Sequence, residues 1–132
     1  MVPYVIQQAV QATADAHRDR LRMMLERQDG PDWLAALNDR RRQDMLANGR
    51  PAPAPLRAFD ARAVIHCLAY DQSGRQVLPA TATGKAKQLL GLANAAHHPD
   101  PDAPLTEAEA YRAWQLYTDL TGLTRTDDPF GP

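Results

Sequence analysis

The stretch Leu89–Trp114, LLGLANAAHHPDPDAPLTEAEAYRAW, joins the end of one predicted helix to the start of the next. The residue before a proline is pushed out of helical geometry, so His98-Pro99 predicts the end of the first of these helices. Thr106–Glu109 matches a capping box, in which the threonine hydroxyl and the Glu109 carboxylate satisfy free amides at a helix start. The stretch therefore predicts two helices separated by a short loop rich in proline and aspartate.

Upstream, Tyr4–Gln28 predicts one long amphipathic helix, because apolar side chains recur at steps of three and four. Asp29-Gly30-Pro31-Asp32 ends it, since glycine supplies a left-handed turn and proline cannot continue the hydrogen-bond ladder. The side chains expected to face inward are Ile6, Val10, Thr13, His17, Leu21, Met24 and Leu25.

A second helix is expected from Trp33 to Asn48-Gly49, with Arg40-Arg41-Arg42 largely outward. Arg50–Arg57, RPAPAPLR, favours extended polyproline geometry and predicts an exposed connector inside the domain.

The last three of the five predicted helices follow the connector. Asp60 can cap a third helix, and Asp71-Gln72-Ser73-Gly74 predicts a turn after it. Val77-Leu78 could form a brief extended piece, and Thr83 is expected to cap a fourth helix, Gly84–Ala96. The fifth helix follows the capping box, and its expected inward face is Ala110, Ala113, Trp114, Tyr117 and Leu120.

Composition agrees with an all-α fold. The chain has 132 residues, of which 44% are hydrophobic but only 6% aromatic, so alanine and leucine must supply most of the buried surface. That favours close-packed helices. We predict a compact five-helix bundle over residues 1–122, followed by a loose tail, 123–132. The single cysteine, Cys67, and the lack of a signal or membrane-spanning run indicate a cytoplasmic protein.

Polar chemistry is concentrated in the loop region, where His97, His98, Asp100 and Asp102 could in principle hold a metal ion. Neighbouring helix residues point about 100° apart, so adjacent histidines rarely bind one ion. A third ligand from His17 or His66 is not indicated, and both are expected to be buried, hydrogen-bonded core residues. We therefore predict no metal and no cofactor. The alternative for Asn94 and the histidines is plain helix termination.

The segment Leu92–His98, its Pro/Asp loop and the following Leu105–Tyr111 resemble the end of a HEPN domain. HEPN proteins are small all-α bundles whose signature is an arginine, a polar residue and then a histidine four to six positions after the arginine. In active members, the arginine and histidine of two protomers are thought to form a metal-independent ribonuclease site.

Carried over residue by residue, the resemblance places Asn94 at the polar position and His98 at the catalytic histidine, with His97 as its rival. The arginine position falls on Ala93. Alanine cannot stabilise developing charge, so the resemblance implies a degenerate member of the family. Arg112 could substitute across a dimer. The basic run Arg40-Arg41-Arg42 is a second candidate for RNA contact, although such runs are commonly solvated helix faces.

The sequence thus predicts a homodimeric, HEPN-like module of a defence or toxin–antitoxin-like system. It would be associated with RNA or with a protein partner, and its ribonuclease activity would be weak or absent. The alternatives are a non-catalytic protein–protein adaptor subunit of a larger complex and, third, an active metal-independent endoribonuclease that uses His98.

Overall fold

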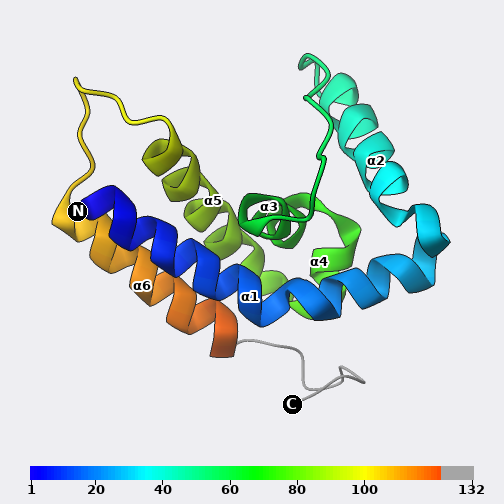
Figure 1. Ribbon diagram of the computed structural model, residues 1–132, viewed down its shortest axis with the longest axis horizontal. Coiled ribbons are helices and arrows are strands. Elements are labelled where there is room, and N and C mark those ends of the chain that lie inside the picture. The colour runs from blue at the N-terminus through cyan, green and yellow to red at the C-terminus, as the bar shows by residue number, and fades with distance from the viewer. Residues whose placement is uncertain (123–132) are drawn as a thin grey trace.

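The computed structural model describes residues 1–122 as an all-α fold, with no strand in that part of the chain (Figure 1). The predicted tail, 123–132, lies outside the described residues. Five helices have ten residues or more, and their order is α1 (Val2–Asp29), α2 (Trp33–Ala47), α3 (Ala61–Tyr70), α5 (Thr83–His97) and α6 (Glu107–Gly122). A short helix, α4 (Gln72–Val77), follows α3, and two 3₁₀ turns, Gly30–Asp32 and Ala80–Ala82, complete the order.

The long helix α1 is the central element of the fold, and α3, α5 and α6 pack against it (Figure 1). Its predicted inward stripe is confirmed except at Met24, which is only partly buried. The helix ends at Asp29, and the next residue, Gly30, has the positive φ (75°) that favours glycine, although its ψ of −159° differs from that of the left-handed turn predicted there. Among residues 1–122, no helix combines the length and apolarity needed to cross a membrane.

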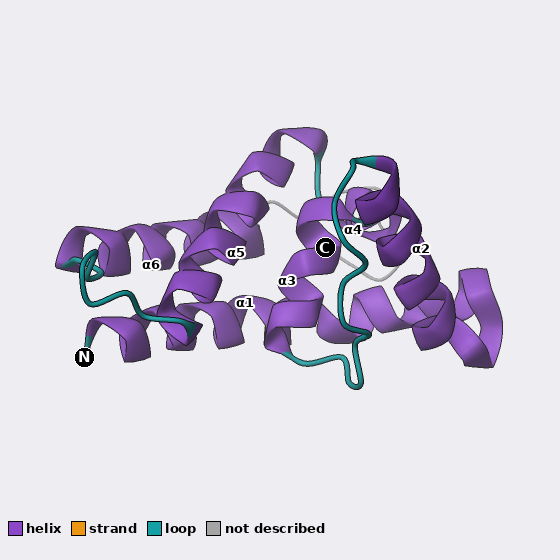
Figure 2. Cartoon of the chain, turned by 90° about the horizontal axis from the view of Figure 1, so that it is seen from above, coloured by secondary structure: helices purple, strands orange, loops and turns teal. Residues whose placement is uncertain are grey.

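Helix α2 lies at one end of the molecule, away from α5 and α6 (Figures 1 and 2). Its predicted end at Asn48-Gly49 is confirmed, and Leu37 is its one fully buried side chain. The Asn38 side chain fastens the proline-rich connector to it by accepting from the Leu56 amide (2.7 Å) and donating to the Leu56 carbonyl (3.0 Å).

The outward orientation predicted for Arg40-Arg41-Arg42 is wrong for the first two residues. Arg40 and Arg41 are partly buried between α2 and its neighbours, and only Arg42 is exposed. The physical reason is that α2 fully buries only one side chain, Leu37, so arginine stems and ion pairs supply much of its contact surface.

Around α3, the Asp60 cap is confirmed, since its carboxylate accepts from the Ala63 amide at 2.9 Å. The turn predicted at residues 71–74 is wrong, because Asp71 instead caps α4 by accepting from the Ser73 amide. Gly74 allows α4 to lie against α3: a Cβ built there would come within 2.3 Å of the Cys67 carbonyl oxygen. Of the pair Val77-Leu78, considered as a brief extended piece, only Leu78 is extended, because Val77 is the last residue of α4.

Helix α5 begins at Thr83 without the threonine cap that was predicted, because a 3₁₀ turn leads directly into it. The capping box of α6 is confirmed: Glu109 Oε1 accepts from the Thr106 amide at 3.0 Å, and Thr106 Oγ1 accepts from the Glu109 amide at 3.2 Å. The prediction that Trp114 faces inward is wrong. Leu116 is buried there instead, and Trp114 is exposed.

Candidate nucleic-acid interface

The signature residues Asn94, His97 and His98 lie at the carboxyl end of α5, and all three are exposed. His98 is the C-cap residue, and its backbone amide donates to the Asn94 carbonyl at 3.0 Å. The two imidazole rings meet edge to face, with centroids 4.6 Å apart. Exposure leaves these side chains accessible to a ligand, while the backbone contact shows that His98 also terminates the helix.

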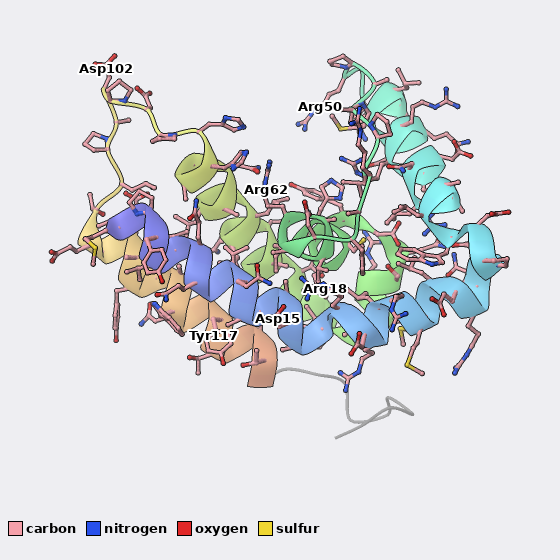
Figure 3. The ribbon with its side chains drawn as sticks, viewed as in Figure 1. Asp15, Arg18, Arg50, Arg62, Asp102 and Tyr117 are labelled. Atoms are coloured by element: carbon pink, nitrogen blue, oxygen red, sulfur yellow. The ribbon has the colours of Figure 1, made fainter. Side chains whose placement is uncertain are left out.

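An arginine that was not among the predicted site residues reaches this cluster from the neighbouring helix. Arg62, in the first turn of α3, donates a 2.6 Å hydrogen bond to Asn94 Oδ1 and lies between α3 and α5 (Figure 3). Helices α3 and α5 pack closely along their length, which fixes this juxtaposition. The signal available in the sequence was the pair Arg62 and His66, four residues apart and therefore on one helix face.

Arg62, Asn94 and His66 line a groove between the connector, α3 and α5, with a volume of about 440 Å³. The connector residues 54–56 form its opposite wall, and Arg41 reaches it from α2. A smaller hollow of about 260 Å³ on the other side of Arg62 is lined by His97. Arg62 thus belongs to both depressions and links the groove to the end of α5. We call Arg41, Arg62, His66, Asn94 and His97 the α3–α5 cluster.

The groove combines cationic groups with a neutral imidazole. Burial lowers the pKa of His66, and the positive charge of Arg41 lowers it further, so His66 is neutral near pH 7. Burial also lowers the pKa of Arg41. Two buried nitrogen atoms, Arg41 Nε and His66 Nδ1, lack a hydrogen-bond partner. The acidic residue that lines the groove, Asp60, has its carboxylate engaged as the α3 cap.

His66 therefore differs from the buried, hydrogen-bonded residue that was expected, because it is only partly buried and its Nδ1 is unsatisfied. His17 does match that expectation: it is buried, and its Nε2 lies 3.0 Å from the Leu120 carbonyl oxygen.

The remaining predicted RNA-contacting arginines lie elsewhere. Arg40 is held in ion pairs with Asp29 and Asp71, each at 3.0 Å. Arg42 is exposed and lines a separate depression on the outer side of the connector. Arg112 donates to Gln88 Oε1 at 2.8 Å, at a position about two and a half turns before His97 on α5.

His98 faces a different environment from His97. It lines a hollow of about 530 Å³ that is formed mainly by prolines and other apolar side chains of the α5–α6 loop. The structure therefore brings Arg62, Asn94 and His97 together, and it leaves His98 and Arg112 outside that cluster.

The geometry does not indicate metal binding or a reactive thiol in the described part of the chain. Within residues 1–122, no group of three or more histidine, cysteine, aspartate or glutamate side chains is arranged to hold a metal ion. Cys67 is fully buried, and burial raises the pKa of its thiol to about 12, so it carries no thiolate at neutral pH.

Comparisons of the chain with protein-family models, with curated proteins and with solved structures give no match.

Proposed function

We propose that this chain is an RNA-associated helical module whose α3–α5 cluster contacts the ribose–phosphate backbone, with weak or no ribonuclease activity. The observation that carries the proposal is the Arg62–Asn94 contact, which supplies an arginine beside the polar position of the HEPN-like signature. The resemblance stated above implies the biological setting, a defence or toxin–antitoxin-like system.

Local charge favours a polyanionic ligand although the whole chain carries a net charge of −1. Residues 40–62 contain six arginines and two aspartates, and Arg40 is paired with the carboxylates of Asp29 and Asp71. Arg42, Arg50 and Arg57 are exposed around the connector, beside the groove. Phosphate contacts by such side chains supply most of the affinity in non-specific nucleic-acid binding.

Several features argue for weak chemistry at the cluster. Ala93 occupies the signature arginine position, and the Arg62 guanidinium is already engaged by Asn94. The ring contact of His97 is with His98, which cannot orient it as a carboxylate would. General-base catalysis needs an imidazole held within hydrogen-bond reach of the proton that it removes. Because the His97 and His98 rings are exposed and contact each other, we expect general-base catalysis at this position to be inefficient.

Binding is tested by fluorescence anisotropy of a labelled single-stranded RNA at low salt, without metal. Arg62→Gln should weaken binding severalfold. It should also reduce the slope of log affinity against log salt by about 0.7, the loss of one single-strand phosphate contact. Arg22→Gln is the matched control, because Arg22 lies on the exposed surface of α1, in long surface ion pairs. Equal affinities for the wild type and Arg62→Gln would contradict the proposal.

Cleavage is tested by incubating the same RNA with the wild type, His97→Ala and His98→Ala. We expect slow or undetectable cleavage by the wild type, and we expect any residual activity to depend on His97. Rapid cleavage that is lost only in His98→Ala would favour the active-endoribonuclease alternative.

A protein–protein adaptor is the second candidate function. It is favoured by exposed aromatic side chains on α6, which lie on a different helix from the α3–α5 cluster.

A further inference from the structure

Helix α6 carries a row of three aromatic rings, of which two are exposed and the third, Tyr117, is partly buried. Tyr111 is 67% exposed and Trp114, one turn later, is 38% exposed. The Tyr117 ring packs edge to face against Trp114, with centroids 5.3 Å apart. We call Tyr111, Trp114 and Tyr117 the aromatic stripe. Exposed tyrosine and tryptophan side chains grouped in this way are typical of interaction surfaces.

The connector 50–57 has the chemistry that such rings bind. It contains three alternating prolines, forms no helix or strand, and is fastened to α2 through Asn38 and Arg41. Pro51 and Pro55 are exposed. Proline-rich segments lose little conformational entropy on binding, and aromatic surfaces are their usual receptors.

The two surfaces are also complementary in charge. Residues 99–122, which include the α5–α6 loop and α6, carry five acidic side chains and one arginine. Glu107, one turn before Tyr111 on the same helix face, is exposed. The connector is flanked by two exposed arginines, Arg50 and Arg57. Charge complementarity of this kind steers association and fixes the orientation of the partners.

A single chain cannot bring these surfaces together. Helices α2 and α6 lie at opposite ends of the molecule in both views, and Arg50 and Tyr117 are far apart in Figure 3 (Figures 1, 2 and 3). The connector is held beside α2 by the Asn38 hydrogen bonds. A connector that docks on the aromatic stripe must therefore belong to another molecule.

We propose that the connector of one copy of this chain docks on the aromatic stripe of a second copy, with Arg50 and Arg57 directed toward the acidic start of α6. The contact is heterologous, because it joins two different surfaces, and each pair keeps one free connector and one free stripe. It therefore differs from an isologous homodimer, in which the same surface of both copies meets.

The experiment is sedimentation equilibrium of the full chain over a range of concentrations at low salt. The average mass of the wild type should rise with concentration. Trp114→Ala and the double variant Arg50→Glu/Arg57→Glu should each weaken self-association at least about tenfold. Each variant retains the surface that the other lacks, so an equimolar mixture should form a 1:1 complex that grows no further.

Matched controls separate this docking from general effects of the substitutions. Tyr70→Ala removes an exposed ring on α3, and Arg22→Glu/Lys87→Glu makes the same charge change on surfaces elsewhere. Both should associate like the wild type. Tyr111→Ala replaces Trp114→Ala if circular dichroism shows that the latter loses helix.

Three outcomes would overturn the proposal: a wild type that stays monomeric at the highest concentration, a Trp114 or Tyr111 variant that associates normally, or a mixture of the two defective variants that remains monomeric. The Arg62→Gln variant should self-associate like the wild type. RNA binding and self-association can therefore fail independently of each other.

Discussion

At the scale of single residues, His17 occupies the contact between α1 and α6. It is 1% exposed, its Nε2–H donates to the Leu120 carbonyl, and its Nδ1 has no partner. Burial lowers the pKa of this imidazole, and the hydrogen bond to Leu120 offsets burial only in part. The folded chain therefore holds His17 in its neutral form.

This arrangement predicts a loss of stability in mild acid. The pKa of His17 is lower in the folded than in the unfolded chain, so the unfolded state binds more protons as the pH falls. The contribution to stability is complete above the unfolded pKa of about 6.5 and is lost as the pH falls toward the folded pKa. Urea unfolding at pH 7.5 and 5.5 should show a smaller pH dependence for His17→Leu than for the wild type. Some dependence should remain, because the pKa of His66 is lowered too.

The close approach of the α3 backbone to Gly74 gives a second prediction for a single residue. A methyl group there would overlap the Cys67 carbonyl, so Gly74→Ala should lower the free energy of unfolding by about 1–3 kcal/mol. Gly91 is the matched control, since it is also helical but has open space around its Cα. Gly91→Ala should instead raise stability by about 0.5–1 kcal/mol. Chemical denaturation measures both, and a neutral Gly74→Ala would show that α4 does not pack closely against α3.

At the scale of the elements, Arg40 joins three helices. From α2 it pairs with Asp29 at the end of α1 and with Asp71 at the junction of α3 and α4. Burial raises the pKa of Asp71, but hydrogen bonds from Arg40 and Ser73 outweigh that effect and keep the pKa below its usual value. Since α2 fully buries only Leu37, the ion pairs of Arg40 contribute much of the free energy that holds α2 against the rest of the fold.

Removing this arginine should destabilise the fold. Arg40→Met leaves Asp71, whose side chain is 6% exposed, as an uncompensated buried charge, at a cost of about 3 kcal/mol. Arg42→Met, on the exposed side of the same helix, should stay within about 0.5 kcal/mol of the wild type. Equal losses from the two variants in urea unfolding would contradict the role assigned to Arg40.

Local patterns in the sequence predicted much of this architecture, and the failures have physical causes. The Asp60 cap, the Gly30 and Gly49 helix ends and the α6 capping box depend on residues close in the chain, and all were predictable. The α4 helix and the exposure of Trp114 depend on tertiary packing, which overrides local preference. At the candidate site, the resemblance to the HEPN signature selected Asn94 and His98, with His97 as the rival, and the structure places Asn94 and His97 but not His98 beside Arg62. Arg62 was missed because its contact with Asn94 spans 32 positions of the chain.

At the scale of the whole molecule, the basic and acidic surfaces are separated. The connector, α2 and the start of α3 carry the arginine excess, whereas the α5–α6 loop and α6 carry the acidic excess. The α3–α5 cluster lies between these regions, at the seam of two tightly packed helices. An RNA strand is thus expected to approach from the connector side and to avoid the outer face of α6.

Hydrogen exchange of the full chain with and without bound single-stranded RNA tests this placement most directly. The account predicts slower amide exchange on RNA binding in peptides covering residues 54–66 and 90–98, which hold the groove, and unchanged exchange along residues 110–120 of α6. Protection confined to α6, or no protection at any salt concentration where the RNA binds, would contradict it.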